Sequence, residues 1–98
     1  MKFSTNSITT VLDPKTTKKK YPVARIIVLD DNINSFEHVA ICLMKIIPEM
    51  SKERSWELTV KIDREGSAKV WRGPIEQAEL YHEQMVYEGL TMALIEKT

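Results

Sequence analysis

The chain has 98 residues, and its 14 Lys and Arg residues balance its 14 Asp and Glu residues, giving a formal net charge of zero. This balance provides no field of one sign that would favour nucleic acid, and no apolar run reaches the roughly 18 residues needed to span a bilayer. The single cysteine excludes a disulfide within the chain and suits a reducing compartment. We therefore expect a cytoplasmic, one-domain protein that binds neither nucleic acid nor membrane.

The first 20 residues differ from the rest of the chain. They hold several Lys and Thr together with Ser and Asn and show no hydrophobic periodicity, so they cannot bury enough surface to offset the entropy of ordering. They also lack the apolar centre of a signal peptide. We expect a disordered N-terminal extension at residues 1–20 and a folded domain at residues 21–98.

The first two elements of the domain are a strand and a helix. Residues 24–29 are apolar and rich in β-branched side chains, which predicts a strand buried largely on both faces. Asn34, followed three residues later by Glu37, predicts a helix start of the capping-box type, and Pro48 ends the helix near residue 47. The inward stripe of this helix is expected to be Phe36, Val39, Ala40, Leu43, Met44 and Ile47.

The remaining elements follow without a linker. Ser51 is expected to cap a second helix to about residue 62, and residues 67–71 alternate as in a half-buried strand. A third helix is predicted from Gly73-Pro74, with the proline at its first position, to Gly89, and a last strand at residues 90–95. The side chains expected to face inward from these two helices are Trp56, Thr59, Val60, Ile62, Ile75, Ala78, Tyr81, Met85 and Val86, while Trp71 of the strand is also assigned to the core.

The order β-α-α-β-α-β predicts an α+β fold, a two-layer sandwich in which three helices cover a three-stranded antiparallel sheet. A doubly wound parallel sheet is excluded because only one strand is continuously apolar.

Asp30-Asp31-Asn32 closes the first strand just before a helix begins, which is a common place for a ligand group. Ionised carboxylates there would accept hydrogen bonds from a cation. Asp and Asn are also favoured in turns and helix caps. The triplet alone is therefore compatible both with a ligand site and with a simple turn.

No pattern in the chain predicts catalysis. An acidic pair after the first strand is also found in receiver domains, but no later strand here ends in Asp and the chain is too short. His38 and Cys42 lie one helical turn apart without further ligands nearby, and Cys42 is better explained as a core residue. The three glycines form no phosphate-binding loop. We expect neither an enzyme nor a bound metal or cofactor.

The third helix carries acids at positions 76, 79 and 83, which place Glu side chains along one face. Such a face is either simply solvated, with the first acids complementing the helix dipole, or a docking surface for a basic partner.

From residue 21 to its end, about four fifths of its length, the chain resembles the ClpS family of Clp protease adaptors. The resemblance rests on the polar triplet, on residues 36–39, on Glu65-Gly66 before the second strand, and on residues 94–97. Further segments resemble the cyanobacterial and plastid branch of the family, namely residues 47–51, 56–59, 73–82 and 89–93.

The resemblance implies recognition rather than catalysis. Members of the family bind the free α-amino group and the bulky first side chain of N-degron substrates, usually Leu, Phe, Tyr or Trp. They deliver these substrates to a ClpC- or ClpA-type AAA+ unfoldase, docking on its N-terminal domain, and their flexible tail is then engaged. We accordingly expect a monomeric adaptor. The alternative is a regulator that occupies the unfoldase N-terminal domain through the third helix without carrying N-degrons.

The resemblance also implies which residues hold the α-amino group. The family triplet is usually Asn-Asp-Asp, and its first and third members correspond to Asp30 and Asn32, with Asp31 between them. The binding histidine of the family corresponds to Asp63. We expect the three carboxylates to crowd one site, so that repulsion raises the pKa of at least one, unless Arg64 neutralises Asp63.

The pocket for the first side chain is implied in the same way. The family's gate residue, usually Met, corresponds to the bulkier Phe36. The implied pocket walls are Val28, Leu29, Asn34, Val39, Thr59 and Ile62.

The resemblance also implies which residues dock on the unfoldase. The docking acids of the family correspond to Glu76 and Glu79, and Tyr81 stands where some bacterial members have Lys.

Overall fold

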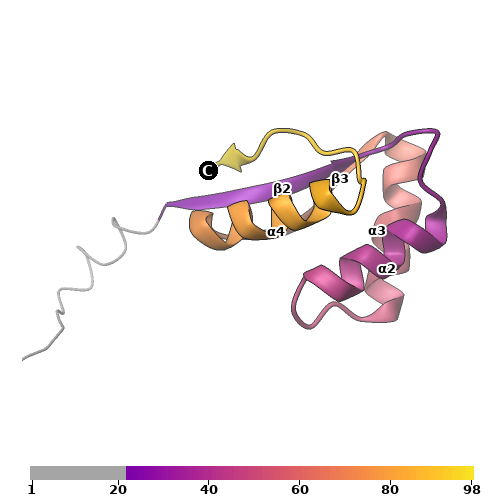
Figure 1. Cartoon of the computed structure of the whole chain (residues 1–98), viewed down its shortest axis with the longest axis horizontal. Coiled ribbons are helices and arrows are strands. Elements are labelled where there is room, and N and C mark those ends of the chain that lie inside the picture. Colours follow the sequence, from indigo (N-terminus) through magenta and orange to yellow (C-terminus); the bar gives the residue numbers. More distant parts are fainter. Residues whose placement is uncertain (1–21) are drawn as a thin grey trace, which may run out of the picture.

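The computed structural model of the protein describes residues 22–98, so the extension predicted for residues 1–20 lies outside the described part. The predicted α+β class and element order are confirmed (Figure 1). The elements are β2 (Val23–Leu29), α2 (Phe36–Ile46), α3 (Lys52–Glu65), β3 (Ser67–Pro74), α4 (Ile75–Tyr87) and β4 (Glu96–Lys97).

β2 is the central strand of the antiparallel sheet, whose order is β3-β2-β4. Figure 1 shows the three helices on one side of the strands and the C-terminal segment running back along β2. The pairing of β2 with β3 shifts register between Ile26 and Ile27, a bulge that increases local twist. The sheet and the helices thus form the two predicted layers.

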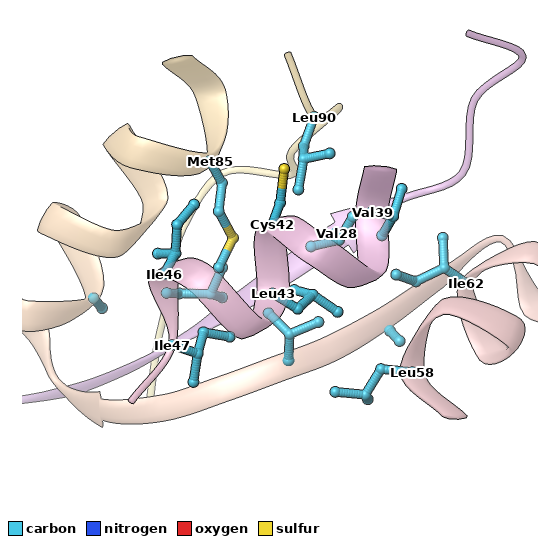
Figure 2. Packing of buried hydrophobic residues seen from close by; sticks show 14 of the residues in the cluster. Val28, Val39, Cys42, Leu43, Ile46, Ile47, Leu58, Ile62, Met85 and Leu90 are labelled. Carbon is cyan, nitrogen blue, oxygen red and sulfur yellow. The ribbon is translucent and has the colours of Figure 1, made fainter. Parts of the chain in front are cut away.

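The core lies between β2 and the helices. Alternate residues of β2, namely Ala24, Ile26 and Val28, are fully buried, whereas the residues between them are only partly buried. The prediction of burial on both faces was therefore wrong, because only one face of the sheet is covered by helices. Figure 2 shows side chains from α2, α3 and α4 meeting β2, among them Leu43, Leu58, Ile62 and Met85.

Both early helices begin at a serine. The Ser35 hydroxyl oxygen accepts a hydrogen bond from the His38 N–H at 3.1 Å, so Ser35 is the N-cap of α2 and the capping role predicted for Asn34 was wrong. Ser51 caps α3 as predicted, accepting from the Arg54 N–H at 3.0 Å. α3 continues to Glu65, where Gly66 ends it with a φ of 89°, a conformation that glycine adopts without strain.

The C-terminal part differs from the prediction in two places. Pro74 is the N-cap of α4 rather than its first residue, because β3 continues to Pro74. Residues 90–95 form no regular strand: they meet β2 through an isolated bridge between Val28 and Met92, and only Glu96–Lys97 pairs as β4. This segment is apolar because single side chains such as that of Leu90 are buried in the core, while Leu94 is exposed.

Several large side chains expected in the core face outward instead. Trp56 is 44% exposed and Val86 is 52% exposed, and Phe36 and Met44 lie at the surface of α2. On α2 and α3 the core is filled instead by residues that include Ile46, Ser55 and Leu58, together with Cys42, which was predicted to be a core residue. Trp71 is partly buried against Tyr81, and its ring lies so close to Gly73 that an added Cβ there would come within 2.4 Å of it.

Candidate functional site

A small pocket opens where the carboxyl end of β2 meets α2, α3 and the segment after α4. Its volume is about 60 Å³. Ten of the eleven predicted substrate-binding residues line it, and Asn32 does not. The lining residues are Val28, Leu29, Asp30, Asp31, Asn34, Phe36, Val39, Thr59, Ile62, Asp63, Leu90 and Thr91.

The end of β2 is held from both sides at this pocket. The Leu29 N–H donates to the Thr91 carbonyl at 2.8 Å, and the Asp30 N–H donates to the Gly66 carbonyl at 2.9 Å. The polar triplet therefore begins at a backbone position that two neighbouring segments fix. Sequence reasoning missed the contribution of Leu90 and Thr91 to the pocket, although both lie in residues 89–93, one of the segments that carry the family resemblance.

Asp31 is the hub of a hydrogen-bond network in the loop before α2. One carboxylate oxygen accepts from the Ile33 N–H at 2.9 Å and the Asn34 N–H at 2.8 Å. The other oxygen accepts from the Asn34 side-chain amide at 2.7 Å and the Thr91 hydroxyl at 2.6 Å. These four donors occupy the acceptor capacity of the carboxylate. Asp31 therefore shapes the loop and has little left to offer a ligand.

The pKa of Asp31 departs from the expectation based on crowded carboxylates. The Asn34 backbone hydrogen bond, the Thr91 hydroxyl and the Ile33 backbone N–H lower it well below its ordinary value. Repulsion from neighbouring acids does not raise it, because donors surround the carboxylate. The prediction was that at least one of the three carboxylates has a raised pKa, and Asp31 is not that one.

Asp30 and Asp63 are the carboxylates at this pocket that remain open to a ligand. Both line it and both are exposed, and within residues 22–98 neither accepts a hydrogen bond nor forms an ion pair. Arg64, the alternative partner considered for Asp63, makes no ion pair with it. Two unpaired acids beside one small pocket provide strong acceptors for a cation.

Asn34 contributes a third acceptor. Its side-chain amide donates to Asp31 at 2.7 Å and to the Gly89 carbonyl at 3.0 Å. Both amide hydrogens are thereby used, and the amide oxygen of Asn34 is left as an acceptor at the pocket wall. The Asp31 network thus orients Asn34 as well as the loop.

The interior of the pocket is apolar. Val28, Val39, Ile62 and Leu90 are buried, and the hydroxyl of Thr59 donates to the Ser55 carbonyl of its own helix at 2.8 Å. A hydroxyl satisfied in this way offers no free proton to a ligand. An apolar floor below a polar rim can receive a hydrophobic side chain and a neighbouring cationic group together.

The three residues predicted to contact a partner lie on α4. Glu76 and Glu79 are exposed in its first turns. Tyr81 is partly buried on another face of the helix, where its ring meets Trp71 edge to face at 5.0 Å. The structure therefore leaves the two acids accessible and turns Tyr81 toward the sheet.

His38 and Cys42 form a packing contact between α2 and α4. The His38 ring bonds the Glu88 carbonyl at 2.8 Å, and Cys42 is buried beside it, where burial raises the pKa of the thiol. The assignment of Cys42 to the core is confirmed. Within residues 22–98 no three His, Cys, Asp or Glu side chains are grouped to hold a metal ion, and no helix there is long and apolar enough to cross a membrane.

The structure thus combines an α+β scaffold with one small pocket that has an apolar interior and a polar rim. Residues 19–92 match the sequence model of the family described as "ATP-dependent Clp protease adaptor protein ClpS". The chain belongs to this family, and so to the adaptors of Clp proteases rather than the proteases themselves.

Similar proteins of this family come from cyanobacteria. The ClpS adapter protein of Thermosynechococcus vestitus is 59% identical over 80 residues, which are 82% of this chain and 85% of the relative. Those of a Synechocystis and a Nostoc strain are 55% and 51% identical over 82 residues, in each case 84% of both chains. The resemblance inferred from the sequence, including its cyanobacterial character, is confirmed.

Proposed function

We propose that the protein binds the N-terminal residues of substrate proteins in the pocket at the end of β2 and delivers them to a ClpC- or ClpA-type AAA+ unfoldase. The observation that carries this proposal is that one pocket of about 60 Å³ combines an apolar floor with two carboxylates, Asp30 and Asp63, that have no hydrogen-bond or ion-pair partner within residues 22–98. A chain terminus combines the two matching features, an ammonium group and a first side chain.

The acceptors divide into those that shape the site and those that contact the ligand. Asp31 holds the loop through four hydrogen bonds, and its role is to present the neighbouring groups. Asp30, Asp63 and the amide oxygen of Asn34 take the three N–H groups of the terminal ammonium. In this arrangement Asp63 supplies the acceptor that the family's histidine supplies elsewhere, and Asn32 lies outside the contact set.

The partner is the N-terminal domain of the unfoldase, which docks on the exposed acids of α4. Glu76 and Glu79 complement a basic surface there, and the pocket residues lie on other elements, so that one adaptor binds substrate and unfoldase together. The proposal takes the adaptor to act as a monomer in the cytoplasm, together with the unfoldase.

A peptide pair tests the proposal. A fluorescent peptide with a free N-terminal Leu should show saturable binding by anisotropy, and the same peptide N-acetylated should not bind, because acetylation removes the charge and two of the N–H donors. Equal binding of the two peptides, or binding of neither, would overturn the proposal. In the second case, retained binding to the unfoldase would favour a regulator that occupies its N-terminal domain.

A further inference from the structure

Phe36 and Trp56 form an aromatic pair beside the pocket. Their ring centroids lie 5.7 Å apart with an angle of 70° between the ring planes, an edge-to-face arrangement that is favourable for aromatic rings. Phe36 is part of the pocket wall, whereas Trp56 is not. Trp56 therefore contacts a wall residue from outside the pocket.

The exposure of the pair is unusual for side chains of this size. Phe36 is 37% exposed and Trp56 is 44% exposed, although aromatic side chains generally contribute most when buried. α3 fills its inward positions with Ser55, Leu58 and Thr59 instead. Since these residues complete the core without the indole, packing in the core does not explain why Trp56 stands next to Phe36.

Both rings belong to residues near the N-terminus of a capped helix. Phe36 is the first residue of α2, directly after the capping Ser35, and Trp56 lies one turn inside α3, after the capping Ser51. α2 and α3 pack against each other. The distance between the rings is thus set by two capped helices rather than by a mobile loop.

We propose that Trp56 is a positioning residue, which holds the Phe36 ring at the pocket wall and thereby restricts the first side chain of the substrate. This inference rests on the proposed function, because it assumes that the pocket receives that side chain. With the ring fixed, the pocket stays narrow near the substrate backbone. Side chains that branch at Cβ need width at that point and are disfavoured relative to Leu or Phe.

The test is a selectivity ratio, measured with fluorescent peptides that begin with Leu or with Ile and are otherwise identical. Trp56→Ala should bring the two dissociation constants closer by about two- to tenfold, the range that an edge-to-face pair provides. Trp56→Phe should keep most of the selectivity, because it keeps an aromatic partner. In a Phe36→Ala background, Trp56→Ala should change the ratio no further.

Trp71 provides the matched control. It packs on Tyr81, outside the set of residues that line the pocket, so Trp71→Phe should leave the ratio unchanged. Because the chain has two tryptophans, this variant also makes Trp56 the sole indole. Its fluorescence should change when the Leu peptide binds and should not respond to the acetylated peptide.

The outcomes separate the inference from the function on which it rests. If wild type binds the free Leu peptide and Trp56→Ala leaves the ratio unchanged, or adds fully to Phe36→Ala, the positioning role is overturned while the function stands. If no free N-terminal peptide binds, the proposed function falls and the inference falls with it. Trp56→Leu, which keeps an apolar side chain, gives the same test where Trp56→Ala does not fold.

Discussion

Asp31 is the residue on which the loop before α2 depends most. Replacing it by Asn keeps the shape but removes the charge that its four donors surround, so the free energy of unfolding at pH 7 should fall by about 1–2 kcal/mol, less than the sum of four bonds because the residue is partly exposed. Urea denaturation of Asp31→Asn against wild type measures this. Asp30→Asn, a neighbour that accepts no hydrogen bond within residues 22–98, is the control and should change stability by under about 0.5 kcal/mol.

The stability difference between wild type and Asp31→Asn should depend on pH in a defined way. The pKa of Asp31 is lowered in the folded protein from an ordinary value of 3.8, so its contribution is fully present above that pH and is lost as the pH falls through the lowered folded-state value. The stability difference between wild type and Asp31→Asn should therefore be constant from pH 7 to about pH 5 and shrink under strongly acidic conditions. A difference that grows on acidification would contradict the network.

Asp63 stands at the position where the family resemblance implies a binding histidine. If its carboxylate contacts the terminal ammonium, Asp63→Ala should weaken binding of a Leu-initiated peptide by about tenfold or more, because a hydrogen bond between charged groups is lost. Asp63→His, which restores the family's usual residue, should retain measurable binding. Arg64→Ala is the matched control: Arg64 does not line the pocket, and its removal should leave affinity unchanged. Unchanged affinity in Asp63→Ala would leave the ammonium to Asp30 and Asn34.

At this scale the sequence predicts which residues surround the pocket better than it predicts what each one does. The resemblance placed Val28, Phe36 and Ile62 correctly at one pocket because they follow from aligned segments. The saturation of Asp31 could not be foreseen, since one of its donors, Thr91, lies 60 residues further along the chain. Local propensity carries no information about such a partner.

At the scale of elements, the proposed function assigns docking to α4 and substrate binding to the pocket at the end of β2. Reversing both Glu76 and Glu79 to Lys should weaken binding to the unfoldase N-terminal domain by about tenfold at low salt and by less at high salt. Peptide affinity should be unaffected, because neither acid lines the pocket. The control reverses Glu53 and Glu57 on α3, which changes the net charge equally. If both double variants lose the same affinity, the effect is one of overall charge and the docking surface lies elsewhere.

The elements themselves were predictable where a periodic pattern is joined to a stop signal. α2 was found from its stripe and from Pro48, α3 from its capping Ser51, and β2 from its apolar run, although α3 continues to Glu65, beyond the predicted end near residue 62. The last strand was misplaced because residues 90–95 are apolar for another reason: they anchor single side chains and bond their backbone to β2 at Thr91 and Ala93. The pattern of such a segment resembles a strand, although it pairs only in part.

At the scale of the whole molecule, the pocket is built from residues 28–91 alone. Deleting residues 1–20 should therefore leave the affinity for a Leu-initiated peptide within about twofold, since no pocket residue is removed. Degradation of a model substrate by the complete unfoldase and protease should slow, because the family resemblance implies that the extension is engaged during delivery. Equal degradation with the full and the shortened chain would assign the extension no such role.

Both edges of the sheet are protected against pairing with a further strand, which limits the ways in which another chain can bind. β3 is an edge strand, but it carries exposed Lys69 and Arg72, a register shift opposite Ile26 and Ile27, and Pro74 at its end, all of which discourage a further strand from adding. The other side of β2 is covered by the C-terminal segment (Figure 1). Clients on their way to an unfoldase present many extended stretches that could join an open sheet. Under the proposed function, protection of both flanks would leave binding to the one feature that each chain has only once, its N-terminus.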